Sequence, residues 1–283
     1  MTTSSQPRIL GAARRPGSIE LIRQGLGEMW SRRRLARYLV RAELHKHGAD
    51  TVLGNVWWIL DPLLQMAVYV VLVSVIFRSG KDDYPLFVFA AILPWKWFTS
   101  AVNDGITAVT SRDRIIKQVK FPKIVLPVAA TLGGIVNFAF GMIPLLALTI
   151  FFYSNRLSWT LLLIPLIATV QFVFSLAFAI IVSAVNVFFR DIANVARHGL
   201  RLWFYLSPAL YTLEDVRTKS HGLGTIMSLN PWTPLFESYR AVIYDSALPD
   251  WLGLGVLLAG SLVVLAGAIL LFKRLEPAFA KVL

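Results

Sequence analysis

Residues 119–127 read Val-Lys-Phe-Pro-Lys-Ile-Val-Leu-Pro and join a basic segment to a long apolar one. Proline restricts the residue before it to extended conformations, so Phe121-Pro122 predicts that one helix ends before another begins. No charged side chain occurs from Ile124 to Tyr153. A helix needs roughly 20 apolar residues to cross a bilayer core about 30 Å thick. The stretch therefore predicts an all-α integral membrane protein.

The composition supports this class, because 56% of the residues are hydrophobic and only 16% are charged. The third and fourth predicted spans are long for one crossing, which indicates tilt or protrusion from the bilayer. The first 50 residues are polar and basic, without the early apolar core of a cleaved signal peptide. The six predicted spans are 55–77, 86–109, 124–153, 159–189, 197–213 and 251–272.

The basic residues predict the orientation. With an even number of spans and both termini inside, 21 of the 28 Lys and Arg residues lie on the inner face and six on the outer face. The positive-inside rule then places both termini in the cytoplasm, in the cytoplasmic (inner) membrane. The net charge of +12 indicates anionic lipid headgroups and phosphorylated lipid as partners rather than nucleic acid.

The first 50 residues divide into two parts, which precede the membrane domain of residues 51–283. Residues 1–18 are predicted to be a disordered tail. Residues 19–50 are predicted to form an amphipathic interface region, in which Leu35 and Leu39 oppose arginines. A basic helix with one apolar stripe usually lies flat at the membrane surface. It is interpreted either as a membrane anchor alone or as an anchor that also packs on a cytoplasmic partner.

Two connecting segments carry further amphipathic patterns. Residues 110–123 combine basic side chains with apolar ones at helical spacing, which favours a short docking helix for a soluble protein over a merely solvated loop. Residues 214–250 contain Asn230-Pro231 and then an apolar stripe too short to span. Such segments are typical of re-entrant or interfacial helices. The docking residues predicted in the first segment are Arg112, Arg114, Ile115, Ile116 and Lys117.

The sequence indicates no chemistry within the chain itself. Gly80-Lys81 is followed by Asp82 and lacks the preceding glycine of a phosphate-binding loop, so no ATP site is predicted. Cysteine is absent, and His45 and His47 have no carboxylate cluster beside them, so no metal site is predicted either. A membrane-embedded glycosyltransferase or phosphatase would need a clustered acidic or histidine site.

Charged residues within the predicted spans mark a possible pathway, because intramembrane charge is costly. Asp104 lies near the end of its span and is interpreted as hydrated. Asp61 and Lys96 lie at similar depth in antiparallel spans. They either pair with each other or leave Lys96 lining a hydrated pore.

Several motifs, in this order and spacing, resemble the membrane subunit of ABC-2-type polysaccharide exporters over about residues 30–283. Those exporters move lipid-linked O-antigen, capsule, teichoic-acid or galactan chains. The resemblance implies a homodimer of six-helix subunits with two copies of a separate ATPase that binds ATP and Mg, and no catalytic residue or cofactor in this chain. The motifs are Val56–Leu63, Leu93-Pro94-Trp95, Val119–Pro127, Phe188–Ile192, Leu206–Tyr211 and Asn230-Pro231.

The resemblance also implies site residues. The first and fifth spans line the channel in this family, which assigns Trp58, Tyr69, Trp203 and Tyr205 to sugar stacking, although aromatic side chains also pack against lipid and neighbouring helices. The lipid diphosphate would enter near the cytoplasmic surface, where arginine can bind phosphate oxygens bidentately. The residues predicted there are Arg34, Arg37, Arg41 and Lys46, which otherwise serve only as topology determinants. The competing interpretation is an ABC-2 drug or small-lipid exporter, which needs fewer aromatic residues.

Overall fold

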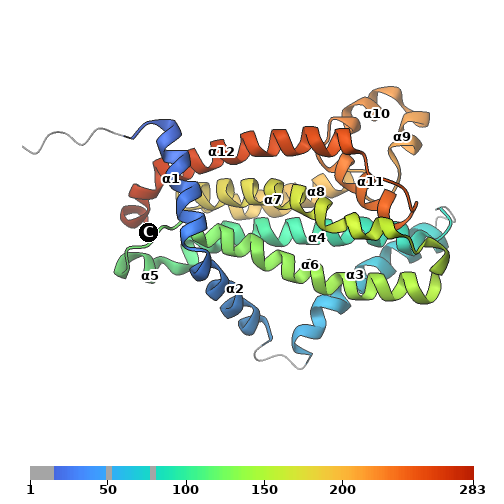
Figure 1. Ribbon diagram of the computed structural model, residues 1–283, viewed down its shortest axis with the longest axis horizontal. Helices are drawn as coiled ribbons and strands as arrows, with labels where there is room; N and C mark the ends of the chain where they lie inside the picture. Colours follow the sequence, from blue (N-terminus) through green and yellow to red (C-terminus); the bar gives the residue numbers. More distant parts are fainter. Residues whose placement is uncertain (1–15, 49–52, 77–80) are drawn as a thin grey trace, which may run out of the picture.

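The computed structural model describes residues 16–48, 53–76 and 81–283, and every regular element in these ranges is helical (Figure 1). The predicted disordered tail lies outside the described residues apart from its last three positions, and Ser18 already begins a helix. The α-helices are α1 Ser18–Ser31, α2 Arg33–Gly48, α3 Trp57–Val70, α4 Tyr84–Ala108, α5 Asp113–Gln118, α6 Val125–Phe152, α7 Ile164–Asn186, α8 Ile192–Tyr205, α9 Leu213–Lys219, α10 His221–Ser228, α11 Trp232–Ile243 and α12 Trp251–Val282. Short 3₁₀ turns occur at Gly54–Val56, Thr110–Arg112, Ser154–Arg156 and Trp159–Leu163, and the π-helical segment Val71–Ile76 continues α3.

Five helical segments in the described residues are long and apolar enough to cross a membrane. They agree with five of the six predicted spans, and α12 continues beyond its predicted end at residue 272 through a charged segment. The predicted span 197–213 is wrong in its bounds. Its helix, α8, runs from Ile192 to Tyr205 and is about 21 Å long at 1.5 Å per residue. Turns follow α8 because Pro208 cannot continue the helical hydrogen-bond pattern.

Helix α4 lies at the centre of the bundle and packs against α6 and α7. Its side chains are buried almost without interruption from Leu86 to Trp95. Small residues allow the close approach, as Gly105 shows: a Cβ atom there would lie 3.1 Å from the Cα of Ala179. Close packing through small residues is how membrane helices associate when lipid removes the hydrophobic advantage. This helix therefore holds the neighbouring helices in register.

Besides the core around α4, a second apolar cluster lies at the end of the bundle that carries α1, α2 and α5 (Figure 1). Phe272 and Phe279 of α12 meet there edge to face at a centroid distance of 5.2 Å. Helix α1 packs on α12 through an ion pair in which Lys273 Nζ lies 2.9 Å from Glu28 Oε2. Lys273 also contacts Glu276, which accepts the backbone N–H of Lys123 at 2.8 Å. The segment after Phe121-Pro122 is thus anchored to the end of α12.

Helices α9, α10 and α11 gather at the opposite end of the bundle (Figure 1). The apolar stripe predicted in residues 214–250 forms α11, and this helix is buried in the protein. Trp232, Phe236 and Tyr239 are fully buried, and the first two belong to one aromatic cluster with Trp95 of α4. Burial against α4, α7 and α12 explains why a helix of this length is stable without crossing the bilayer.

Candidate functional site

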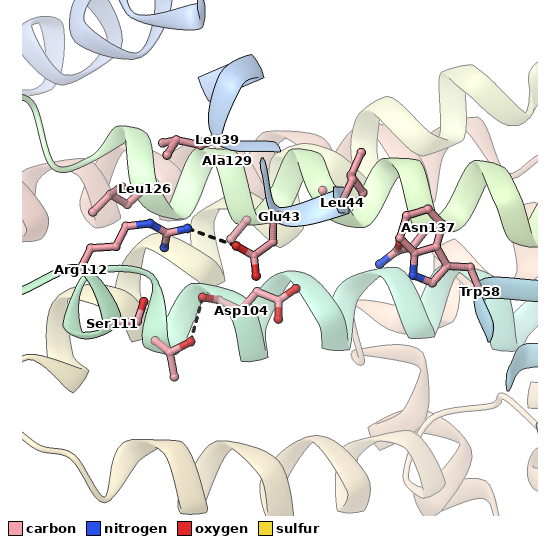
Figure 2. Close-up of a pocket in the computed structure, with 13 residues that line it drawn as sticks. Leu39, Glu43, Leu44, Trp58, Asp104, Ser111, Arg112, Leu126, Ala129 and Asn137 are labelled. Carbon is pink, nitrogen blue, oxygen red and sulfur yellow. Dashed lines mark hydrogen bonds and ion pairs between the residues drawn. The ribbon is translucent and has the colours of Figure 1, made fainter. Parts of the chain in front are cut away.

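A cavity of about 350 Å³ lies between α2, α4 and α6, at the end of the bundle that carries the interface helices. Figure 2 shows Leu39, Glu43 and Leu44 of α2 on one side of it and Asp104 of α4 on another. Arg112 Nη2 lies 3.4 Å from Glu43 Oε2, so the 3₁₀ turn before α5 is tied to α2. Two carboxylates and one guanidinium therefore make this cavity polar.

A second cavity, of about 400 Å³, adjoins the first, because Trp58 and Asn137 line both. These two side chains lie together at one edge of the first cavity (Figure 2). Trp58 packs on Phe140 of α6 at a centroid distance of 5.0 Å. The Oδ1 atom of Asn137 is buried without a hydrogen-bond partner. The pair of cavities forms a track along α3, and an indole ring and an amide oxygen stand where they meet.

Of the two alternatives that the sequence left open for Asp61 and Lys96, the structure shows the pair, which lies in the second cavity. Lys96 Nζ donates to Asp61 Oδ2, and it lies 3.4 Å from Gln65 Oε1. The Asp61 side chain is 65% exposed and that of Lys96 is 28% exposed, so both reach the cavity while they pair. A close partner reduces the cost of each charge in the bilayer, and the pair supplies hydrogen-bonding groups to the track.

The structure brings Tyr69 of α3 and Tyr205 of α8 together, with 3.5 Å between the two hydroxyl oxygens. Tyr69 is 9% exposed and Tyr205 is 52% exposed. Trp203 lies apart from them in the aromatic core, where its Nε1 donates to Asn230 Oδ1 at 3.1 Å. Its ring packs against Trp95 and Phe98, so its surroundings favour a packing role. Of the four predicted channel residues, Trp58 lines a cavity and Tyr205 is exposed, whereas Tyr69 is buried behind Tyr205.

Three of the four predicted lipid-diphosphate residues lie on the outer face of α2. Arg34, Arg37 and Arg41 are exposed, while Leu39 and Glu43 of the same helix face the first cavity. The side chain of Lys46 lies outside the described residues. The arginines therefore form a basic stripe outside the cavity, at the level where α2 meets α6.

The five predicted docking residues separate into two groups. Arg114, Ile115 and Lys117 of α5 are exposed, and Ile115 is 51% exposed despite its apolar side chain. Ile116 is instead buried in the second apolar cluster, because it faces back toward α12. Arg112 is turned toward Glu43. The surface available for a partner is therefore the outer face of α5.

Gln171 of α7 is a structural residue that the sequence patterns did not indicate. Its amide donates to the carbonyl of Pro94 at 2.7 Å and accepts from Tyr239 Oη at 2.8 Å. It bridges α7 to the proline of α4 and to α11. A buried amide in an apolar span is a detectable signal, because an amide in hydrocarbon needs partners.

The buried role of Arg240 was not predicted either, although this residue interrupts the apolar stripe of α11. Its guanidinium is buried and donates to the carbonyls of Pro208 at 2.6 Å, Tyr211 at 3.1 Å and Ala209. It also lies 3.8 Å from the ring centroid of Phe87. Arg240 therefore fixes the turn after α8 to α11, and Asn230 adds a bond from its Nδ2 to Ser207 Oγ at 2.8 Å.

Five long apolar helices, of which α4 is buried at the centre of the bundle, and amphipathic helices packed at one end define a multi-pass membrane protein. The family of ABC-2 type transporters matches residues 34–244, and the chain belongs to this family. It is 34% identical to the O-antigen export system permease protein RfbA of Myxococcus xanthus over 90% of this chain and 97% of that protein. It is 29% identical to a protein of the same name from Klebsiella pneumoniae over 83% of this chain and 89% of that one.

Proposed function

We propose that this chain is the transmembrane subunit of an ABC transporter that exports lipid-linked O-antigen polysaccharide across the cytoplasmic membrane, driven by a separate ATPase. The observation that carries the proposal is the identity of 34% with an O-antigen export permease over almost the full length of both proteins. The track of two adjoining cavities along α3 supports it, because a hydrated path with an aromatic wall suits a sugar chain.

The proposed topology has six crossings with both termini in the cytoplasm. Helix α1 precedes the first span, and its Glu28 contacts Lys273 near the end of the last one. Contact between these regions favours an even number of crossings, whereas five helices in the described part of the chain reach full length. We assign the sixth crossing to α8, which packs beside α4 and α7, and the re-entrant role to α9–α11. Outside α8, which carries Arg197 and Arg201, the basic residues divide into 19 inside and six outside, in agreement with this topology.

The sugar path is proposed to run past Trp58 and the Tyr69–Tyr205 pair. Replacing Trp58 or Tyr205 with alanine removes a stacking face, at about 0.5–1.5 kcal/mol for each aromatic contact, and replacing the buried Tyr69 removes the side chain that contacts Tyr205. Export of O-antigen to the cell surface in a strain that lacks the wild-type gene is expected to fall at least threefold for each variant at unchanged protein level. Trp203→Ala provides the contrast, because loss of its core packing is expected to reduce the amount of folded protein. Normal export by all three variants would exclude this path.

The basic stripe on α2 is proposed to recruit the lipid diphosphate. Arg41→Gln removes one guanidinium from the exposed face and leaves Leu39 and Glu43 in the cavity wall. In the reconstituted complex, stimulation of ATP hydrolysis by lipid-linked glycan is expected to require at least five times more glycan, whereas basal hydrolysis stays constant. The guanidinium is suited to diphosphate because it can donate to two oxygens at once. Equal stimulation of the wild type and the variant would reduce Arg41 to a determinant of membrane orientation.

A further inference from the structure

A third cavity, of about 630 Å³, lies at the opposite end of the bundle, between α7, α11 and α12. Its wall is mainly apolar and includes Phe174 and Phe178 of α7 and Leu257 of α12. Val256 and Val264 border it and are 68% and 42% exposed, so the cavity opens along the surface of α12. Because α12 is long and apolar enough to cross a membrane, lipid is the molecule that meets this opening.

The floor of the cavity contains a polar group that has no partner. Gly253, Gly260 and Ser261 of α12 line it, and a Cβ atom at Gly260 would meet nothing within 4 Å. Ser261 is 3% exposed, and its Oγ is buried without a hydrogen-bond partner. A buried hydroxyl without a partner is unfavourable, so Ser261 points to a ligand that brings an oxygen acceptor deep into an apolar groove.

Three charged side chains line the same cavity. Asp250 is already engaged at one oxygen, because its Oδ1 accepts the N–H of Gly253 at 3.0 Å. Glu237 is half-buried and forms no hydrogen bond to the described residues. Burial raises the pKa of the Glu237 carboxyl, which shows that the carboxylate there lacks full solvation. Arg240, one turn along α11, donates its hydrogen bonds to backbone carbonyls. The cation that lines the cavity is therefore Arg217.

We propose that this groove binds one phospholipid with a primary ammonium headgroup, of the phosphatidylethanolamine type. The ammonium donates to Glu237, the phosphate faces Arg217, and one acyl chain lies along α12 past Gly260. Ser261, about 12 Å further along α12 than Gly253, donates to a glycerol ester carbonyl. A choline headgroup has no N–H to donate, and an anionic headgroup would place its negative charge beside two carboxylates. The site is separate from the track along α3 and does not depend on which substrate is exported.

Native mass spectrometry of the purified full-length chain tests this proposal. After detergent has removed bound lipid, the chain is titrated with phosphatidylethanolamine and phosphatidylcholine that carry identical acyl chains. The wild type is expected to bind the first at least tenfold more tightly. Glu237→Gln is expected to reduce this preference to less than twofold, because the amide no longer pairs with the ammonium.

Two glycine variants on the same helix test the location. A Cβ atom at Gly260 or at Gly255 meets nothing within 4 Å, so leucine is accommodated at either position. Of these two glycines, Gly260 lines the cavity and Gly255 does not. Gly260→Leu is expected to weaken phosphatidylethanolamine binding at least tenfold, and Gly255→Leu to leave it unchanged, with thermal midpoints confirming that both fold.

The proposal fails if the wild type binds the two lipids equally, if Glu237→Gln keeps the preference, or if the two leucine variants lose binding to the same extent. If Gly260→Leu is unfolded, the comparison of Glu237→Gln with the wild type decides alone.

Discussion

Replacing Arg240 with leucine is expected to abolish export and to remove most of the folded protein from the membrane. The substitution leaves the carbonyls of Pro208, Ala209 and Tyr211 without their charged donor in a buried site. Hydrogen bonds to charged groups contribute roughly 1.5–3 kcal/mol each, so the free energy of unfolding should fall by at least about 3 kcal/mol. Burial lowers the pKa of this guanidinium, and the carbonyls and the Phe87 ring offset that cost in the native protein.

Thermal midpoints of detergent-solubilised protein, measured by fluorescence-detected size exclusion, check this prediction. Arg201→Leu is the matched control, because Arg201 is exposed on α8. Arg240→Lys keeps the charge but loses the fork of donors, and an intermediate midpoint is expected. A midpoint for Arg240→Leu equal to that of the control would show that the turn after α8 does not depend on Arg240.

Reversing two charges on the outer face of α5 is expected to release the ATPase. Arg114 and Lys117 are exposed there beside the apolar side chain of Ile115, which suits a groove on a soluble protein. The double variant Arg114→Glu, Lys117→Glu should lower ATPase co-purification more than tenfold. Arg112 is left unchanged, because its reversal would break the pair with Glu43 and add a third carboxylate to the first cavity. The wild-type complex is expected to hold two copies of each subunit.

The same reversal at Lys81 and Lys219 is the control for net charge. Both are exposed and line the same cavity, and Lys219 belongs to α9, which lies at the end of the bundle away from α5 (Figure 1). Co-purification of the ATPase with this variant should equal its co-purification with the wild type. Full co-purification by the α5 variant would place the ATPase elsewhere, with the outer face of α2 as the next surface to test.

The features that depend on local composition were predicted well. Long apolar segments with few charges located five spans to within a few residues, apart from the end of α12, because hydrocarbon favours apolar side chains regardless of tertiary packing. Similar depth in antiparallel helices made the pairing of Asp61 with Lys96 one of two alternatives, and the structure decided between them. The motif Leu206–Tyr211 was quoted only as a resemblance, and its physical role became visible when Arg240 was found to bind its carbonyls.

The features that depend on packing could not be predicted from the sequence. Ile116 shares its helical spacing with Ile115, and only the position of α12 decides which of them is buried. Trp203 lies between aromatic residues that come from distant parts of the chain. The sequence predicted a span over residues 197–213, whereas the helix ends at Tyr205 because the turn around Pro208 is held by α11.

The proposed export function is tested most directly by reconstitution of this chain with its ATPase in proteoliposomes. Lipid-linked O-antigen polysaccharide is supplied on the face that carries the ATPase, and glycan protected from an added glycosidase is measured before and after ATP. The account predicts protected glycan that accumulates only when ATP and both subunits are present. Glycan that stays accessible under these conditions, while a drug or a small lipid is moved instead, would contradict it.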